Sequence, residues 1–569
     1  DPQQIKCSGN WMWAAKKPGE GPRLLEAAEA AERLMIMLGM AIDGGKDSLS
    51  MAVKLIGEAG VEEIIKAPGQ FIVATYAATS DFTKRVTPDL KRPGNHLYWL
   101  DLGLGQARLG GSALAQTFNQ IGMECPDVND TQALKKTFEG VQQLILEGVV
   151  ESVHDVSDGG LITAVLEMAF AGNTGLKLDL AGNRPVLSTL FAEEPGLVLE
   201  LTPGSSIMAL GLLKGELELP IVKIGEVGEY GGKVVVQHNH NRVLDDSMVE
   251  LRSVWEETGN RLERLQADPD CTIQQEQSLR VVTEPPYGMT FTPVYPNDNP
   301  AIKPRVALLR EEGTNGDREM AATLMLVGFE VQDVTTNDLI AGNVSLDEFV
   351  GLVFPGGFSF GDVLDSAKGW AGVIRFNEEL ARQFERFRNR KNTFSLGVCN
   401  GAQLSPLLGC VPGFDVSENL QPRFIRNKSG RFESRFTTVR IEESPAIMFK
   451  GMAGSILGIW LAHGEGQFRA DRDILDWMLD EKLAPVRYVD NEGSPTEVYP
   501  FNPNGSPQGI AAICSQDGRH VAIMPHLERT SLPWQWPWVP QEWRKDFNAS
   551  PWLKAFQNLY EWCVSNLVH

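Results

Sequence analysis

Residues 305–569 show the most regular pattern of hydrophobic and polar positions in the chain. Short apolar runs of the kind that form buried strands alternate there with longer segments of helical periodicity. Strands separated by helical patterns of roughly 10 to 15 residues are typical of parallel βαβ units, and such sheets carry their reactive groups at the carboxyl ends of the strands. The predicted strands are RVALLRE, FEVQDVT, FVGLVFPGG and TFSLGVC, and the predicted helices are GDREMAATLMLVG, NEELARQFERFRN and GAQLSPLLG. This block is therefore predicted to be a doubly wound α/β sheet.

The first block of the chain, up to about residue 253, mixes helical and strand-like patterns without that regular alternation. Helices are predicted in LLEAAEAAERLMIMLG, TQALKKTFEGVQQLILEG and GLITAVLEMAFAG, and strands in QFIVATYAA, NHLYWLDLGLG, GLVLELT and KVVVQH. Their order favours an α+β or mixed-sheet fold. We expect two subdomains, residues 1–90 and 91–253.

The two blocks are joined by a segment that interrupts regular structure, residues 254–304. It opens with a polar, helix-prone stretch and closes with six prolines, which remove backbone donors and stop helices. We expect a surface helix and a proline-rich linker at the main domain boundary. The prolines are Pro285, Pro286, Pro293, Pro296, Pro300 and Pro304.

Length and composition place the chain among globular proteins of several domains. It has 569 residues, of which 43% are hydrophobic and 22% are charged. Its formal net charge of -22 should repel phosphate backbones, so nucleic acid is not expected as a partner.

The cysteines and the apolar runs indicate a compartment. Seven scattered cysteines show neither a zinc-site spacing nor a dense disulfide framework, which fits a reducing environment. The longest apolar runs, such as residues 33–42, are far shorter than the roughly 18 to 20 residues of a membrane span. A cytoplasmic protein without a membrane partner is expected. The dense sequence that follows Asp1 suggests a piece of a longer protein.

One motif of the second block has the form of a nucleophile elbow, Gly-x-nucleophile-x-Gly, with Cys399 as its central residue. It follows a predicted strand and opens a predicted helix. Flanking glycines relieve the crowding at such a turn, and the helix N-terminus favours a thiolate. The alternative is a small buried cysteine without a chemical role.

A candidate base follows in HVAIMPHLERT, where His526 and Glu528 stand two residues apart near the end of a predicted strand. In extended chain this spacing points both side chains to one face, so the carboxylate can orient the imidazole toward Cys399. The alternative is a surface ion pair. His463 and Glu465 have the same spacing and are a rival pair.

Two backbone groups are candidates for an oxyanion site. Gly357 lies in PGGFS at the end of another predicted strand, and Asn400 follows the elbow cysteine. Their N–H groups are predicted to point at a developing oxyanion, although PGGFS also suits an ordinary turn. Asn427, Arg431 and Glu433 offer polar groups for a zwitterion such as glutamine, or form a solvated loop.

In the first block, HDVSDGG places hard oxygen ligands before a glycine turn and a helix. This is a reasonable arrangement for a nucleotide with its Mg²⁺ ion. Asp-Gly turns are also common helix starts, so the motif by itself is weak.

The combination PGGFS, GVCNGAQ and MPHLER resembles the class I, triad-type glutamine amidotransferases. REEGTNGDREM, NPNGSP and WLAHGEG narrow the resemblance to the large, single-chain formylglycinamide ribonucleotide amidotransferases (phosphoribosylformylglycinamidine synthases) of purine biosynthesis. CSGNWMWAA, DGGKDSLSM, HDVSDGGL and FAEEPG agree, since they resemble the second half of the synthetase region. The resemblance covers nearly the whole chain. It implies an aminoimidazole-ribonucleotide-synthetase-like part followed by a flavodoxin-like amidotransferase domain.

The resemblance also implies roles for particular residues. It places the family's nucleophile on Cys399, its histidine on His526 and its glutamate on Glu528. The family usually has Pro where this chain has Leu527, and often Cys where it has Ala402. Leu527 frees the backbone between the histidine and the glutamate, so their alignment is expected to be looser.

For the first block, the resemblance implies that Asp155 ligates Mg²⁺. Ser157 would touch a nucleotide, an auxiliary ADP rather than the ATP consumed in catalysis. Companion ligands would precede residue 1, so the site is expected to be incomplete. The implied reaction converts formylglycinamide ribonucleotide, glutamine and ATP to the amidine, glutamate, ADP and phosphate.

Two other readings of the chain remain open. The intracellular-protease and deglycase type of α/β protein also carries a cysteine elbow on a flavodoxin-like sheet. A degenerate glutaminase could instead serve as a scaffold, although the presence of all three triad residue types argues against this.

Overall fold

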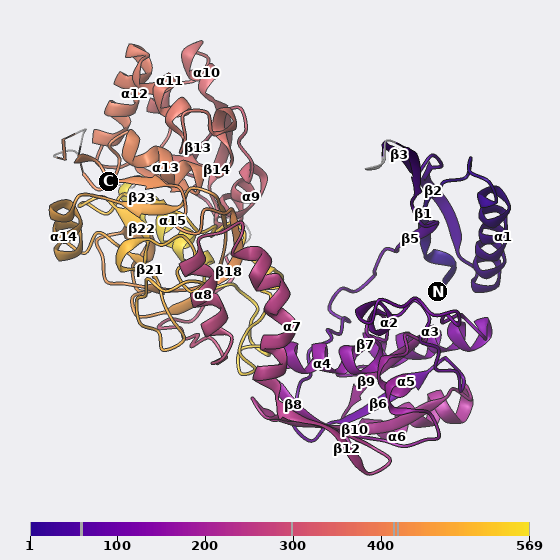
Figure 1. Ribbon diagram of the computed structural model, residues 1–569. Helices are drawn as coiled ribbons and strands as arrows, with labels where there is room; N and C mark the ends of the chain where they lie inside the picture. The colour runs from indigo at the N-terminus through magenta and orange to yellow at the C-terminus, as the bar shows by residue number, and fades with distance from the viewer. Residues whose placement is uncertain (1, 57–60, 297–299, 414–415, 418–419, 568–569) are drawn as a thin grey trace. The chain divides into compact units, whose positions relative to one another are not determined.

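The computed structural model describes residues 2–56, 61–296, 300–413, 416–417 and 420–567 (Figure 1). The chain forms two compact units, Asp1–Trp255 and Glu256–His569. The division falls inside helix α7 (Met248–Glu263), close to the predicted boundary at residue 253.

The first unit begins with a small mixed sheet whose strand order is β2-β1-β5. The central strand pairs in parallel with β2 and antiparallel with β5, and helix α1 follows it in sequence. A separate two-stranded sheet joins β3 and β4. The bounds are β1 (Lys6–Met12), α1 (Glu20–Leu38), β2 (Ala41–Ser48), β3 (Ala52–Ile56), β4 (Glu62–Lys66) and β5 (Gln70–Tyr76).

The rest of the first unit is a seven-stranded mixed sheet with the order β12-β11-β8-β10-β6-β9-β7. The two faces of β6 belong to different cores: Leu97 packs with α4 on one face, and Leu100 packs with α3 on the other. Apolar residues on both faces of one strand mean that both faces are covered. The strands are β6 (His96–Asp101), β7 (Ser152–Asp155), β8 (Thr174–Leu180), β9 (Gly196–Leu201), β10 (Ile221–Tyr230), β11 (Lys233–His238) and β12 (Asn241–Ser247), and the helices are α2 (Ala113–Thr117), α3 (Thr131–Leu146), α4 (Gly160–Gly172), α5 (Val186–Phe191) and α6 (Ser205–Leu210).

The second unit is built on a nine-stranded sheet with the order β14-β13-β15-β16-β23-β22-β21-β18-β19. The first five strands are parallel, and in chain order they read 2-1-3-4-5, which is the flavodoxin-like arrangement. The predicted fold class is thereby confirmed. These strands are β13 (Arg305–Arg310), β14 (Glu330–Thr335), β15 (Gly351–Phe354), β16 (Phe394–Val398) and β23 (His520–Ile523).

The sequence pattern did not predict the antiparallel extension of this sheet. Four further strands follow β23 across the sheet, and a two-stranded ribbon of β17 and β20 lies outside it. The extension is β18 (Glu433–Ile441), β19 (Ile456–His463), β21 (Val486–Tyr488) and β22 (Ile510–Cys514), and the ribbon is β17 (Arg423–Ile425) and β20 (Gln467–Arg469).

Helices cover both faces of the parallel strands. In β13, Val306 and Leu308 face a core shared with α9 and α15, whereas Ala307 and Leu309 face a core shared with α10, α11 and α12. The helices of this unit are α8 (Pro269–Ser278), α9 (Asp317–Val327), α10 (Thr336–Ile340), α11 (Lys368–Arg375), α12 (Glu378–Asn389), α13 (Asn400–Leu407), α14 (Arg472–Asp480) and α15 (Leu553–Leu567). No described helix is both long and apolar enough to cross a membrane.

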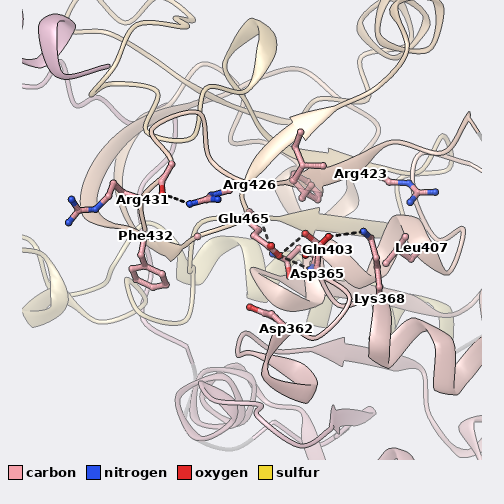
Figure 2. Close-up of a pocket in the computed structure, with 15 residues that line it drawn as sticks. Asp362, Asp365, Lys368, Gln403, Leu407, Arg423, Arg426, Arg431, Phe432 and Glu465 are labelled. Carbon is pink, nitrogen blue, oxygen red and sulfur yellow. Dashed lines mark hydrogen bonds and ion pairs between the residues drawn. The ribbon is translucent and has the colours of Figure 1, made fainter. Parts of the chain in front are cut away.

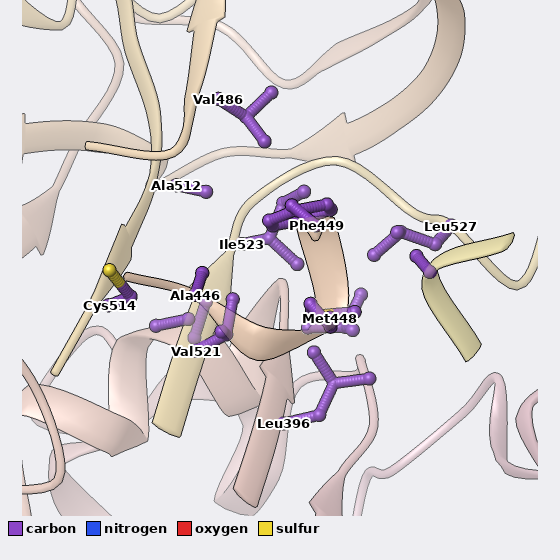
Figure 3. Packing of buried hydrophobic residues seen from close by; sticks show 14 of the residues in the cluster. Leu396, Ala446, Met448, Phe449, Val486, Ala512, Cys514, Val521, Ile523 and Leu527 are labelled. Atoms are coloured by element: carbon purple, nitrogen blue, oxygen red, sulfur yellow. The ribbon is translucent and has the colours of Figure 1, made fainter. Parts of the chain in front are cut away.

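The larger core of the second unit holds the strands that carry the candidate site. Leu396 of β16 and Ile523 of β23 are fully buried, together with Met448 and Phe449 of a nearby turn (Figure 3). Each such side chain contributes about 1.5–3 kcal/mol by burial. The carboxyl ends of β16 and β23 are thus anchored beside each other.

Candidate functional site

Cys399 lies between β16 and α13 on a sharp turn. Its φ of 52° and ψ of -107° are rare for a residue with a side chain, so the turn is strained. The two flanking glycines allow a very close approach of other backbone. A Cβ on Gly397 would lie 2.3 Å from the Gly401 carbonyl oxygen, and a Cβ on Gly401 would lie 2.0 Å from that of Phe354. The local structure is that of a nucleophile elbow.

His526 and Glu528 form a buried pair beyond the end of β23. His526 Nδ1 and Glu528 Oε1 are 2.5 Å apart, and the two residues are 2% and 1% exposed. The strand ends at Ile523, earlier than the pattern predicts, because Pro525 has no N–H to pair. The His526 backbone is instead held by its N–H, which donates to the Trp460 carbonyl at 2.7 Å.

The two positions that depart from the family pattern, Leu527 and Ala402, are both fully buried. The Leu527 side chain packs in the core cluster (Figure 3). This packing holds the backbone between the histidine and the glutamate in place of the proline ring. The expected loosening is not observed, since the two side chains are within hydrogen-bonding distance.

Gly356 shows that Cys399 and His526 lie side by side. A Cβ built on Gly356 would lie 2.8 Å from His526 Cε1 and 3.4 Å from Cys399 Cβ, so this one glycine borders both side chains. The thiol donates to the Ala462 carbonyl at 3.4 Å, while His526 Nε2 has no hydrogen-bond partner among the described residues. A rotation of the Cys399 side chain away from Ala462 would bring the sulfur closer to the imidazole. Hydrogen bonds of catalytic groups are often unformed without substrate.

We expect Gly356→Ala to slow glutamine turnover about 10- to 100-fold. The new methyl group would displace the His526 ring, and a small displacement of a reacting group lowers the rate by about this factor. The Michaelis constant for glutamine should change little. Steady-state kinetics test this, with Gly372→Ala as the control, since a Cβ at Gly372 makes only ordinary contacts, the nearest at 3.8 Å. Unchanged turnover in Gly356→Ala would show that the ring position is not critical.

The protonation of His526 is governed by its neighbours. Burial lowers its pKa, but the Glu528 carboxylate and the nearby Cys399 outweigh burial and raise the pKa to about 10. The imidazole is therefore protonated at neutral pH in the resting protein. A protonated ring can give a proton to a departing group.

The predicted oxyanion loop is tied to the elbow through Asn400. Its side-chain oxygen accepts from the Ser359 N–H at 3.2 Å, and its amide donates to Gln403 at 2.8 Å. Gly357 belongs to the same PGGFS loop and pairs with Thr314. The loop and the start of α13 are thus fixed to each other beside the sulfur.

The rival pair is not formed. His463 ends β19, but neither of its ring nitrogens has a hydrogen-bond partner among the described residues. The Glu465 carboxylate instead accepts from the N–H and the hydroxyl of Ser366, at 2.6 and 2.8 Å. Burial and the charge of His526 lower the pKa of His463 to about 3, so the ring is neutral.

The second unit has a polar pocket of about 610 Å³ (Figure 2). Acidic residues from the loop after β15 and from the turn after β19 line it, and basic residues from β17 and the following loop line it as well. Asn400, next to the cysteine, contacts Gln403 and also Asp362, 3.5 Å away, and both line the pocket. The charged lining residues are Asp362, Asp365, Lys368, Arg423, Arg426, Arg431 and Glu465.

Of the three residues singled out for a zwitterionic ligand, only Arg431 lines this pocket. Asn427 is buried and bonds the carbonyls of Arg431 and His463, and Glu433 is buried against Ser429 and Arg435. The side chains of Asn427 and Glu433 therefore stabilise the loop by hydrogen bonds within the protein. The acidic members of the pocket, Asp362 and Glu465, were missed as ligand-binding residues, because the turn that assembles them has no sequence signature.

The two predicted residues of the first unit lie at the carboxyl end of β7. Asp155 ends this strand and is exposed, and Ser157 is exposed in the turn before α4. The part of the chain that the structure describes contains no group of three His, Cys, Asp or Glu that could hold a metal ion.

Three family models match the chain. Residues 303–563 match the CobB/CobQ-like glutamine amidotransferase domain. Residues 1–78 match the FGAR-AT PurM_N-like domain, and residues 92–237 match the C-terminal domain of AIR synthase related proteins. The part of the second unit from residue 303 to 563 is thus similar to glutamine amidotransferase domains.

Curated relatives match almost the whole chain. A probable phosphoribosylformylglycinamidine synthase, chloroplastic/mitochondrial, from Arabidopsis thaliana is 51% identical over 99% of this chain and 40% of the relative. The phosphoribosylformylglycinamidine synthases of Homo sapiens and Dictyostelium discoideum are 48% and 45% identical over 99% of this chain and 43% and 44% of their own lengths. The resemblance to phosphoribosylformylglycinamidine synthases is confirmed, and the chain spans about two-fifths of the length of these relatives.

Solved structures are similar more remotely. The "Structure of PurLQS from Thermotoga maritima" has a TM-score of 0.34 and 23% identity, and the match covers 47% of this chain and all of that one. "T. maritima PurL complexed with ADP" has a TM-score of 0.32 and 15% identity, over 57% of this chain and 44% of that one.

Proposed function

We propose that this chain carries the glutamine-hydrolysing site of an ATP-dependent amidotransferase of purine biosynthesis. The whole enzyme would convert formylglycinamide ribonucleotide, glutamine and ATP to formylglycinamidine ribonucleotide, glutamate, ADP and phosphate. The observation that carries the proposal is the buried His526–Glu528 pair beside Cys399 on a strained elbow. The names of the curated relatives support the reaction.

In the first half of the proposed reaction, the Cys399 sulfur bonds to the carboxamide carbon of glutamine. The His526 imidazolium gives its proton to the departing nitrogen, the C–N bond breaks, and ammonia leaves a γ-glutamyl thioester. Backbone N–H groups of Gly357 and Asn400 stabilise the negative oxygen of the tetrahedral intermediate.

In the second half, the now neutral His526 takes a proton from water as its oxygen attacks the thioester. The C–S bond breaks, glutamate leaves, and the thiolate and imidazolium are restored. Glu528 stabilises the imidazolium in both halves and fixes the orientation of the ring, since it bonds Nδ1 and leaves Nε2 to face the reacting atoms.

Glutamine is proposed to bind in the polar pocket of the second unit. Its α-ammonium group would pair with Asp362 and Glu465, and its α-carboxylate with arginines that line the pocket, while Gln403 and Asn400 line the path to Cys399. A lining with both acidic and basic groups matches a zwitterion.

The Michaelis constant for glutamine should rise as the pH falls below about 6. Burial, together with the charges of Glu465 and Asp365, raises the pKa of Asp362 to about 6. Its carboxyl group is therefore mostly neutral below that pH and ionised above it. A neutral Asp362 cannot pair with the α-ammonium group. Asp362→Asn should raise the constant about 10-fold at pH 7.5 and abolish this part of its pH dependence.

Kinetics between pH 5 and 8 test the assignment, with Asp333→Asn as the matched control, because Asp333 is paired with Arg310 away from the pocket. A variant Asp362→Asn with the Michaelis constant and pH profile of the unaltered protein would remove Asp362 from the binding site.

The first unit is proposed to supply part of the synthetase site. Asp155 would ligate Mg²⁺ and Ser157 would contact a nucleotide, ATP or ADP, with the remaining groups provided by residues outside this chain. The chain alone is therefore expected to lack synthetase activity. Amidine formation from ammonia and ATP by this chain would contradict this. Cytoplasmic location stays a prediction.

A glutamine-like electrophile distinguishes the proposal from a protease- or deglycase-type hydrolase. Diazo-oxo-norleucine should label Cys399, and glutamine should block the labelling. Labelling at another residue, or labelling that glutamine does not affect, would overturn the glutaminase proposal. Mass spectrometry of the labelled peptide gives the position.

A further inference from the structure

His463 is a buried imidazole for which the proposed reaction has no use. It is 2% exposed, and neither ring nitrogen has a hydrogen-bond partner among the described residues. A buried polar group without a partner destabilises the fold, so a function is expected where such a group is present. The ring is held by close packing: a Cβ on Gly466 would lie 2.4 Å from His463 Cε1.

The position of His463 connects it to the reacting groups. The preceding residue, Ala462, accepts the hydrogen bond of the Cys399 thiol, and Trp460 of the same strand accepts from the His526 N–H. His463 also lies near enough to His526 for the charge of that residue to affect its protonation. The end of β19 therefore brings a second imidazole near the base, in the residue that follows the carbonyl contacted by the thiol.

A neutral imidazole has one nitrogen that donates and one that accepts a hydrogen bond. Burial and the neighbouring His526 lower the pKa of His463 to about 3. A neutral ring can accept a hydrogen bond from an N–H of ammonia. Its own N–H is far too weak an acid to protonate ammonia. Ammonia held there would stay uncharged and nucleophilic.

We propose that His463 is a positioning residue that accepts a hydrogen bond from the ammonia released from glutamine and retains it beside the γ-glutamyl thioester. This inference rests on the proposed glutaminase function. The supporting geometry is the pair of unpartnered ring nitrogens, the contact of Ala462 with the sulfur and the packing against Gly466.

Hydroxylamine is the probe for this position, since it resembles ammonia in size and in hydrogen bonding. Its nitrogen attacks the thioester carbon, the C–S bond breaks, and one proton passes from nitrogen to the sulfur, which gives γ-glutamyl hydroxamate and free Cys399. Water competes for the same thioester and gives glutamate. The ratio of hydroxamate to glutamate therefore measures how well an amine is held, whatever fraction of the protein is folded or acylated.

We expect His463→Leu to lower this ratio about 10-fold at a fixed hydroxylamine concentration. His463→Gln, whose carbonyl oxygen can still accept a hydrogen bond, should keep the ratio within about three-fold of the unaltered protein. The variant pair separates hydrogen bonding from simple packing, because leucine and glutamine both fill the site.

The outcomes are distinct. An unchanged ratio in His463→Leu, even with both products formed more slowly, would assign His463 a structural role and overturn the inference. An equal loss of the ratio in both variants would overturn it as well. If the unaltered protein formed neither glutamate nor hydroxamate from glutamine, the glutaminase proposal itself would fail.

Discussion

Replacing Cys399 by alanine should lower glutamate release from glutamine by at least about 1,000-fold, since the variant has no group that can form the thioester. The fold should be retained, because the substitution removes only the sulfur atom and the strained turn is imposed by surrounding backbone. Coupled detection of glutamate in this chain, with and without the substitution, gives the comparison.

The matched control is Cys125→Ala, because Cys125 is a free, exposed cysteine of the first unit. It should leave glutamate release unchanged. Residual turnover in Cys399→Ala close to that of the control would show that another group performs the hydrolysis. Unchanged turnover in Cys399→Ser would instead favour the alternative in which this chain is a catalytically silent scaffold.

The elbow and the alternation of strands and helices could be predicted because their causes are local. Glycines flank the cysteine because a Cβ at Gly397 or Gly401 would lie within 2.3 Å of other backbone atoms. This requirement is visible in the sequence as a motif. The helices between the strands have strong periodicity. The convergence of Cys399 and His526 then follows from the rule that the carboxyl ends of parallel strands share one edge.

The antiparallel extension could not be predicted in the same way. ILGIWLAH, which forms β19, is an apolar run that suits a buried helix as well as a strand. Its identity is decided by pairing with β18, a contact that depends on the whole sheet. Since Ala462 and His463 belong to β19, the contact of the Ala462 carbonyl with the sulfur could not be predicted from the sequence either.

The acidic wall of the pocket was hidden for a conformational reason. The loop after β15 contains several residues with positive φ that are not glycine, among them Asp362, Leu364 and Ala367. Residues with side chains rarely adopt this conformation, so no propensity indicates it. Such strain at a candidate ligand pocket is consistent with a functional constraint.

Glu528→Gln is expected to lower glutamate release about 100- to 10,000-fold, although the residue keeps its size. The carboxylate is 1% exposed and lies 2.5 Å from His526 Nδ1, so its charge acts on the imidazole with little screening. Without that charge, burial dominates and the pKa of His526 falls, so the imidazolium that protonates the departing ammonia is no longer stable at neutral pH. A substitution Glu442→Gln, which breaks the ion pair with Arg440 elsewhere in the same unit, is the matched control.

The same substitution should change the pH dependence of the free energy of unfolding. In the unaltered protein the pKa of His526 is raised in the folded state to about 10, so its protonation stabilises the fold fully below the pKa of the unfolded chain, and this contribution is lost as the pH rises toward 10. Glu528→Gln should lack that loss, and its unfolding free energy should vary less between pH 7 and 10. Urea unfolding at several pH values measures the difference. Equal pH dependence in both proteins would mean that the Glu528 carboxylate does not raise the pKa of His526. The pair would then have a structural role only.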